Sequence, residues 1–264
     1  MGSFFEIKSY IQHLFRSKGK GGHGIHSPWV YELITQVLHR DKLFYFVDAI
    51  EAERKALLRK HTLLEIMDLG AGSHVSRSNK RSISEMASAA LQPAPQAQAL
   101  AKMVHHYQPE KIIELGTSLG ITTAYLKSAK PTSELFTIEG DKAIAGVAKE
   151  VWQRLGLKDI ELVIGNIDVQ LPSVLQKMQR VDFALLDANH RYEPTLRYFN
   201  WILPYCHEDT ILILDDIHWS KEMNRAWNDI VQHTAITISI DFFHFGLLHF
   251  KKGKEKEHFI VPLP

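Results

Sequence analysis

Apolar and polar residues alternate in regular blocks from about residue 110 to the end of the chain. Short apolar runs, typical of buried parallel strands, stand at 111–115, 134–139, 160–165, 181–187 and 210–216. Stretches with the apolar spacing of amphipathic helices separate them, at 120–129, 142–155, 168–179, 194–203 and 219–232. This alternation predicts an α/β fold with a doubly wound, mostly parallel sheet.

The last part of the chain follows a different pattern. Two β-rich runs, 234–243 and 245–251, have no helix between them, so we expect them to pair as an antiparallel hairpin. Together with the five runs before them, they predict a seven-stranded, Rossmann-like sheet that ends in this hairpin. The charged run 251–257 is interpreted as a solvated turn.

Residues 1–105 are predicted to form a mainly helical extension that caps a second domain at 106–264. Helical patterns stand at 3–16, 28–40, 48–61 and 83–107, the last one interrupted by the prolines of 92–95. One face of 3–16 is apolar, with basic residues nearby. We expect this helix to pack on its own domain; a membrane-surface helix is the alternative, and an exposed face could serve a homodimer.

Composition narrows the classes of function. The formal net charge is +1, so the chain lacks the basic excess expected of a nucleic-acid-binding protein. No apolar run approaches the length of a transmembrane span, and the N-terminus lacks the apolar core of a signal peptide. The single cysteine, Cys206, fits a reducing compartment, so we expect a cytoplasmic protein.

Two similar turns raise the question of where a cofactor binds. DLGAGS (68–73) and ELGTSLG (114–120) each follow an apolar run with an acidic residue and a glycine turn, which can bring backbone N–H groups close to a nucleotide. A nucleotide site also needs a carboxylate at the tip of the next strand, for the ribose hydroxyls. Only 114–120 is followed by such a strand, which ends at Glu139, so this turn is the predicted cofactor site.

The glycine spacing indicates the kind of cofactor. Gly116 and Gly120 form G-x-x-x-G and lack the G-x-G-x-x-G fingerprint of dinucleotide binding. Fewer close backbone approaches are needed when there is no pyrophosphate to bind, as with S-adenosylmethionine. This pattern and the terminal hairpin disfavour the alternative of a nicotinamide-dependent oxidoreductase.

Five segments in a fixed order carry a family resemblance over about 105–250: IIELGTSLGITT, FTIEGD, GNID, VDFALLDANHRYEP and ILILDDIHWS. They resemble the class I S-adenosylmethionine-dependent methyltransferases, in particular the small-molecule O-methyltransferases related to catechol O-methyltransferase. The resemblance implies O-methylation of a small hydroxylated molecule. It also implies the cofactor-binding residues Glu114, Gly116, Thr117, Ser118, Gly120, Glu139, Gly140, Asn166, Ile167 and Asp187.

Three carboxylates stand at the ends of consecutive strands, Asp187, Asp215 and Asp216. Because the carboxyl ends of parallel strands border the ligand crevice, these oxygens could bind one divalent cation such as Mg²⁺. The catechol-type resemblance implies a cation there that orients the substrate hydroxyls, although that family often has Asp-Asn where this chain has Asp-Asp. The alternative for the pair is to cap the helix that starts near Trp219.

Two histidines, His190 and His218, lie close to these carboxylates in the sequence. Either could act as a general base or complete a metal site, because imidazole titrates near neutral pH. A loop histidine bonded to backbone is the alternative reading. We favour His190, which follows Asp187 in the same loop, and predict Asp187 and His190 as the catalytic residues.

The first turn has no cofactor role in this interpretation. It is followed by a basic cluster, His74, Arg77, Lys80 and Arg81. This cluster is either a substrate lid that meets an anionic group or the solvated face of a structural turn. A non-enzymatic alternative also stands. The chain would then be a catalytically silent methyltransferase-like scaffold that binds a partner through residues 1–105.

Overall fold

The computed structural model describes residues 4–17, 25–39, 44–66, 80–253 and 255–263. The chain divides into a middle unit, Asp41–Val174, and a terminal unit, which combines Met1–Arg40 with Leu175–Pro264. This division does not decide the predicted domain boundary between residues 105 and 106, which stays a prediction.

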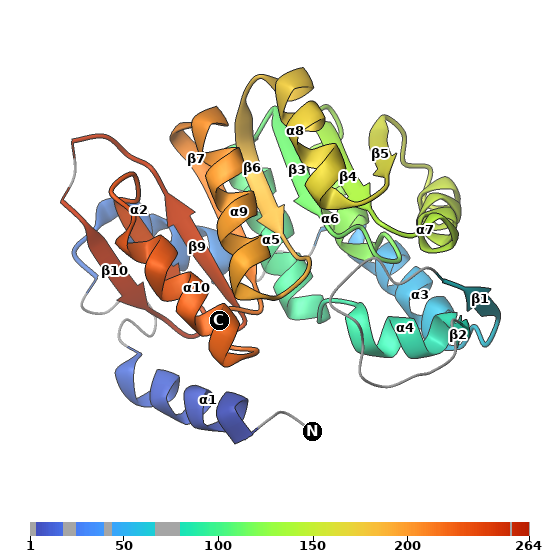
Figure 1. Ribbon diagram of the computed structural model, residues 1–264, viewed down its shortest axis with the longest axis horizontal. Helices are drawn as coiled ribbons and strands as arrows, with labels where there is room; N and C mark the ends of the chain where they lie inside the picture. The colour runs from blue at the N-terminus through green and yellow to red at the C-terminus, as the bar shows by residue number, and fades with distance from the viewer. Residues whose placement is uncertain (1–3, 18–24, 40–43, 67–79, 254, 264) are drawn as a thin grey trace. The chain divides into compact units, whose positions relative to one another are not determined.

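The middle unit contains three parallel strands in the order β3 (Lys111–Leu115), β4 (Glu134–Glu139) and β5 (Ile160–Ile164) (Figure 1). The helix after each strand is α6 (Ile121–Ala129), α7 (Lys142–Arg154) and α8 (Ile167–Met178), whose last turn belongs to the terminal unit. β3 and β4 are mostly buried on both faces, as expected of apolar parallel strands. The predicted alternation of strands and helices is confirmed here.

The earlier part of the middle unit is mainly helical. Its elements are α3 (Val47–Leu58), β1 (Leu63–Glu65), β2 (Lys80–Ser82), α4 (Ile83–Ala90) and α5 (Ala94–Tyr107), with β1 and β2 antiparallel. Ser82 and Glu85 form a capping box that starts α4. The predicted interruption is confirmed, because α5 begins anew after Pro93.

The terminal unit contains five strands in the order β10-β8-β9-β7-β6. They are β6 (Val181–Leu186), β7 (Cys206–Asp215), β8 (Ile238–Asp241), β9 (Phe245–His249) and β10 (Glu257–Ile260). β6 and β7 are parallel, and β8 and β9 form the predicted antiparallel hairpin. β10 pairs parallel with β8 and adds one strand to the predicted seven; it begins at Glu257, where the charged run ends.

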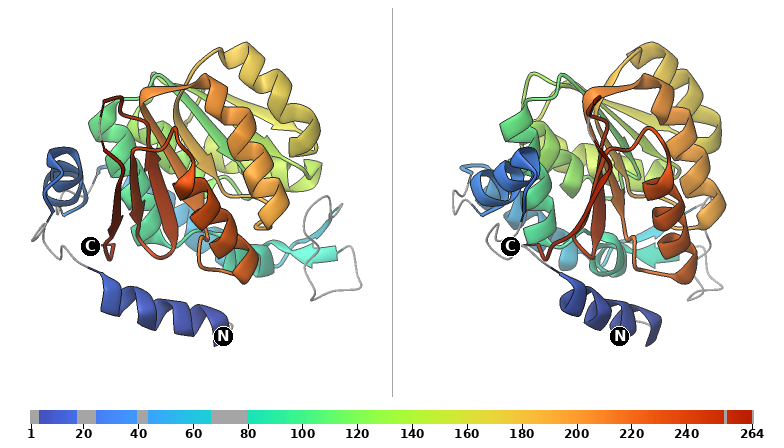
Figure 2. Two further views of the ribbon diagram at one scale, coloured as in Figure 1. Left: turned by 60° about the vertical axis from the view of Figure 1, so that its left-hand side comes forward. Right: turned by 90° about the vertical axis from the view of Figure 1, so that its left-hand side faces the viewer.

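The helices of the terminal unit are α1 (Phe4–Arg16), α2 (Pro28–Glu32), the π-helix η2 (Leu33–Leu38), α9 (Tyr192–Ile202), the 3₁₀ turn η3 (Leu203–Tyr205) and α10 (Lys221–Gln232). Figure 2 shows α9 and α10 on one face of this unit's strands and α2 with η2 on the other. Gly246 allows the close packing of α10, since a Cβ there would lie 2.3 Å from the Trp227 ring. Within the described residues, no helix is long and apolar enough to cross a membrane.

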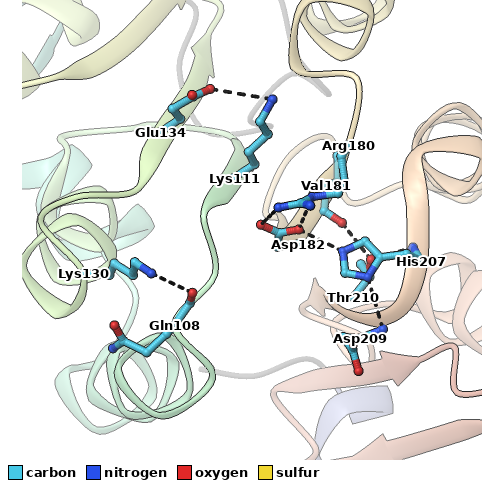
Figure 3. Close-up of polar contacts among 10 residues, drawn as sticks. All are labelled: Gln108, Lys111, Lys130, Glu134, Arg180, Val181, Asp182, His207, Asp209 and Thr210. Carbon is cyan, nitrogen blue, oxygen red and sulfur yellow. Dashed lines mark hydrogen bonds and ion pairs between the residues drawn. The ribbon is translucent and has the colours of Figure 1, made fainter.

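Polar side chains fix the amino ends of the strands (Figure 3). In the terminal unit, the Asp182 carboxylate accepts from Arg180 Nε at 2.9 Å and from His207 Nε2 at 2.8 Å. Thr210 Oγ1 donates to the Val181 carbonyl at 2.7 Å, which ties β7 to β6. In the middle unit, Lys111 Nζ lies 3.9 Å from a Glu134 oxygen. These contacts lie at the opposite strand ends from the predicted site residues.

Candidate functional site

The glycine turn after β3 is built around a buried carboxylate. Glu114, on β3, is fully buried and accepts hydrogen bonds from the hydroxyls of Thr123 (2.5 Å) and Thr137 (2.6 Å). Thr137 also bonds to the Thr117 hydroxyl at 2.6 Å. Glu114 thereby ties together β3, the neighbouring strand β4 and the start of α6.

The turn itself requires glycine at two positions. Gly116 and Gly120 have positive φ angles of 96° and 80°. At Gly120 space is also lacking, because an added Cβ would lie 2.7 Å from Trp152 Nε1, which donates to the Gly120 carbonyl at 2.8 Å. The second glycine of G-x-x-x-G therefore serves the packing of α7 against the turn. Sequence reasoning had assigned it only to the cofactor.

Glu139 ends β4 beside this turn. Its carboxylate accepts the Ser118 N–H at 2.9 Å and the Asp141 N–H at 3.0 Å. Burial raises the pKa of Glu139 above its ordinary value, although these backbone hydrogen bonds oppose the shift. The predicted pairing of the turn with a strand-end carboxylate is thus present, with Gly140 next in the chain.

Asn166 and Ile167 follow β5, the next strand of the same parallel set. The Asn166 side-chain oxygen accepts the Asp168 N–H at 2.8 Å, so Asn166 caps the start of α8. Ile167 is buried. All predicted cofactor residues other than Asp187 therefore lie at or just beyond the carboxyl ends of β3, β4 and β5.

In the terminal unit, the three predicted metal ligands come together at the ends of β6 and β7. Leu186 pairs with Leu214 in parallel register, which brings Asp187 and Asp215 side by side. Their carboxyl groups are hydrogen-bonded to each other. Asp216 follows with a positive φ of 55° and influences the titration of both.

Burial and mutual repulsion raise the pKa values of these carboxyl groups. Burial raises the pKa of Asp187 to about 6, while His190 opposes the shift. The pKa of Asp215 lies well above its ordinary value because of burial and its two neighbouring carboxylates. Burial also raises the pKa of Asp216. Negative charge is therefore costly in this cluster.

His190 is the histidine that faces these carboxylates. Its Nε2 lies 3.5 Å from an Asp187 oxygen and its Nδ1 lies 3.7 Å from an Asp216 oxygen. Nδ1 is buried without a hydrogen-bond partner among the described residues. The preceding Asn189 donates to the Tyr198 hydroxyl and anchors the loop. The second candidate, His218, instead bonds to Asp241 at 2.8 Å.

The carboxylates have the chemistry of a metal site but not a preformed geometry. Among the described residues, no group of three or more His, Cys, Asp or Glu side chains is arranged to hold a metal ion. The alternative capping role at the next helix is wrong, because Ser220 caps α10 by accepting the Met223 N–H.

Some predicted features lie partly or wholly outside the described residues. The first turn, 68–73, and the basic residues His74 and Arg77 fall among them, whereas Lys80 and Arg81 stand in β2. The lid hypothesis therefore stays a prediction.

Comparison with known proteins identifies the domain. Residues 113–217 match a family model described as a methyltransferase domain, and this range holds the glycine turn, Glu139 and the three aspartates. This part of the chain is thus similar to methyltransferase domains. The predicted family resemblance is confirmed.

Relatives by sequence match only parts of this chain. It is 33% identical over 100 residues to a rat protein named transmembrane O-methyltransferase homolog, covering 36% of this chain and 39% of that protein. It is 28% identical over 140 residues to a catechol O-methyltransferase from Niastella koreensis, covering 52% of this chain and 62% of that one. The chain thus spans less than two thirds of the length of these relatives.

Solved structures share the fold of this chain over most of its length. An O-methyltransferase of Klebsiella pneumoniae, named as putative in its description, has a TM-score of 0.56 and 19% identity, covering 80% of this chain and 92% of that one. An O-methyltransferase of Bacillus cereus, in complex with SAH, has a TM-score of 0.55 and 15% identity, covering 84% and 97%. At these identities the likeness establishes the fold alone, which is the predicted class I methyltransferase fold.

Proposed function

We propose that this protein is an S-adenosylmethionine-dependent methyltransferase that methylates an oxygen of a small hydroxylated molecule. The main support for this proposal is the position of Glu139. Its carboxylate lies beside the glycine turn and accepts the Ser118 N–H. A carboxylate offers about four acceptor positions, and the backbone N–H groups of Ser118, Gly140 and Asp141 do not take up all of them, which leaves room for a ribose hydroxyl. The names of the relatives, a catechol O-methyltransferase and an O-methyltransferase among them, support the choice of an oxygen acceptor.

The chain's own residues suit the cofactor that the family uses. Gly116, Thr117 and Ser118 would present backbone around its methionine end, and Glu139 with Gly140 would hold the ribose. Asn166 and Ile167 would border the adenine. When bound, S-adenosylmethionine supplies a methyl group on a positively charged sulfur, suited to in-line transfer.

His190 is the proposed general base. A hydroxyl placed against its imidazole would give up its proton to a ring nitrogen as the oxygen forms the new bond to the methyl carbon. The flanking oxygens of Asp187 and Asp216, at 3.5 Å and 3.7 Å, would stabilise the imidazolium that results. Asp187 is the proposed residue closest to the reacting groups.

A divalent cation is the second part of the proposal. The three carboxylates supply the hard oxygen ligands that Mg²⁺ prefers, and a bound cation would favour their charged forms, which burial disfavours. A cation bound by Asp187, Asp215 and Asp216 would lower the pKa of an acceptor hydroxyl and orient it. Because no three-ligand group is preformed among the residues that the structure describes, these side chains would have to rearrange to bind it.

Turnover with a catechol probe tests this function. The wild-type protein should convert S-adenosylmethionine to the demethylated product when catechol is supplied, and EDTA should abolish the reaction if the cation is needed. His190→Gln should lower kcat about 100-fold or more without changing cofactor affinity. If the cofactor binds but catechol and related hydroxylated compounds are never methylated, the partner-binding scaffold becomes the better account.

Two further proposals concern the state of the protein in the cell. We propose a homodimer formed through the outer face of α1, where Ile7, Ile11, Leu14 and Phe15 are exposed. Light scattering should give twice 30.2 kDa, and Ile11→Ser with Phe15→Ser should halve it; a wild-type monomer would refute the idea.

We also propose a cytoplasmic location, supported by the single cysteine and testable by cell fractionation.

A further inference from the structure

Asp241, at the end of β8, binds two histidines from distant parts of the terminal unit. Its Oδ2 accepts from His218 Nε2 at 2.8 Å, and its Oδ1 lies 3.3 Å from His13 Nε2. His13 Nε2 also lies 3.1 Å from the Asp241 carbonyl oxygen. His13 and Asp241 are both buried, so helix α1 is joined to β8 by a shielded polar contact.

An aromatic residue completes this cluster. Phe243 stacks on the His218 ring, with centroids 5.1 Å apart and planes inclined by 13°, and makes an edge contact with the His13 ring at 5.5 Å. Its N–H donates to Asp241 Oδ1 at 2.8 Å. Its φ is +74°, an uncommon conformation for a bulky residue, so the surrounding contacts hold this turn in place.

His218 belongs to the loop that carries Asp216. The Trp219 N–H donates to the Asp216 carbonyl at 2.9 Å, and Ile217 between them is fully buried. His218 Nδ1 faces the Asn224 amide nitrogen at 3.0 Å, which assigns Nδ1 as acceptor and Nε2–H as the donor to Asp241. One end of this loop is therefore fixed by Asp241, and the other end holds the carboxylate beside His190.

The charge distribution supports a tightly held cluster. Burial alone would raise the pKa of Asp241, but the hydrogen bonds from His13 and His218 outweigh it and hold that pKa below its ordinary value. Asp241 is therefore a carboxylate with three donors, the two histidines and the Phe243 N–H. Such bonds are about twice as strong as neutral ones and keep their geometry.

We propose that His13 and Asp241 are positioning residues for the acceptor part of the site. Through His218 they fix the loop 216–220, and hence the position of the Asp216 carboxylate 3.7 Å from His190. Helix α1 thereby contributes to methyl transfer without touching the reacting groups. This inference rests on the proposed function, in which Asp216 orients the acceptor or its cation.

The test compares substitutions that remove or keep the donor to Asp241. His13→Leu removes it, whereas His13→Gln keeps an amide N–H near the position of Nε2. The matched control is His207→Leu, which breaks a histidine–aspartate contact of the same 2.8 Å length as that of His218, at the amino ends of the strands. Each variant is measured for kcat and KM with catechol and for the Kd of S-adenosylmethionine.

His13→Leu should lower kcat about 10-fold with the cofactor Kd unchanged, because small displacements of a positioned group cost this much or more. His13→Gln should recover most of the loss, and His207→Leu should match the wild type. In NMR spectra of ¹⁵N-labelled histidines, the ring signals of His218 should shift in His13→Leu but not in His207→Leu. This NMR measurement does not depend on enzymatic activity.

Two results would overturn the inference. One is an unchanged kcat in a folded His13→Leu variant; the other is a loss that His13→Gln fails to recover. A wild-type protein that binds S-adenosylmethionine but methylates no acceptor refutes the proposed function, and the positioning role falls with it. Wild-type turnover that is insensitive to His13 refutes the positioning role alone.

Discussion

Gly120 is constrained at the residue scale by its backbone and by its neighbours. Its φ is +80°, and an added Cβ would lie 2.7 Å from Trp152 Nε1 and 2.8 Å from Ala148 Cβ. Gly156 has a similar φ of +68° but nothing within 4 Å of an added Cβ. Substitutions at these two glycines therefore distinguish the free-energy cost of a positive φ, which both share, from the cost of a steric clash, which only Gly120 has.

Gly120→Ala should lower the free energy of unfolding by about 3 kcal/mol, and Gly156→Ala by about 1 kcal/mol. The larger effect adds a steric clash to the unfavourable positive φ that both variants share. Urea denaturation of the two variants measures the difference. Equal losses would show that the contact with α7 does not constrain the turn.

Under the proposed function, we expect the charge of Glu139 to matter for cofactor binding. Glu139→Gln should weaken S-adenosylmethionine binding about 10- to 100-fold, because charge-assisted hydrogen bonds to the ribose are lost. Glu134→Gln is the control, since Glu134 stands at the other end of β4 and is exposed. Calorimetry gives both affinities. Equal affinities for the two variants would remove Glu139 from the binding site.

Sequence patterns predicted these residues with uneven success. The Glu114 turn, Glu139 and the Asp187–His190 loop were found because each follows an apolar strand. Asp241 was missed: it stands inside the β-rich run TISIDFF, and nothing local indicates that His13 meets it. A contact between residues so far apart in the chain depends on tertiary packing, which the sequence pattern does not encode.

At the scale of elements, α1 is held by a titratable contact. Burial lowers the pKa of His13, but its interactions with Asp241 outweigh this and leave the pKa above the ordinary value. Protonated His13 is therefore favoured in the folded state. The resulting stabilisation is fully present below about pH 6.5 and is lost as the pH rises through the folded-state pKa.

The comparison of wild type with His13→Gln tests whether the stabilisation by His13 decreases as the pH rises. Glutamine keeps the hydrogen bond but cannot take up the proton, so the wild type should have the higher Tm at pH 5.5. The difference should shrink by pH 8.5. Differential scanning calorimetry at both pH values measures it. A Tm difference that is constant or grows with pH would contradict a favoured proton on His13.

The sequence pattern predicts where strands and helices lie better than it predicts the type of helix and its capping. β3 and β4 have the predicted bounds, because their apolar runs end sharply at polar residues. The expected helix at 28–40 instead continues from α2 into the π-helix η2, and Ser27 occupies the N-cap position without a side-chain hydrogen bond. Such choices depend on packing against neighbouring elements rather than on local spacing.

At the scale of the whole molecule, the fold is established, residues 113–217 are similar to a methyltransferase domain, and the reaction is proposed. The matched domain, 113–217, covers the glycine turn and the acidic cluster. The residues before it have no counterpart in the family match, and no motif in them indicates an acceptor. This explains why the cofactor could be inferred from the sequence and the acceptor could not.

Titration of S-adenosylmethionine into the purified protein by calorimetry tests the central claim most directly, with NAD⁺ as the comparison ligand. The glycine turn and Glu139 predict micromolar binding of S-adenosylmethionine and none of NAD⁺, because the turn lacks the dinucleotide fingerprint. Binding of NAD⁺ alone, or of neither ligand, would contradict the methyltransferase account.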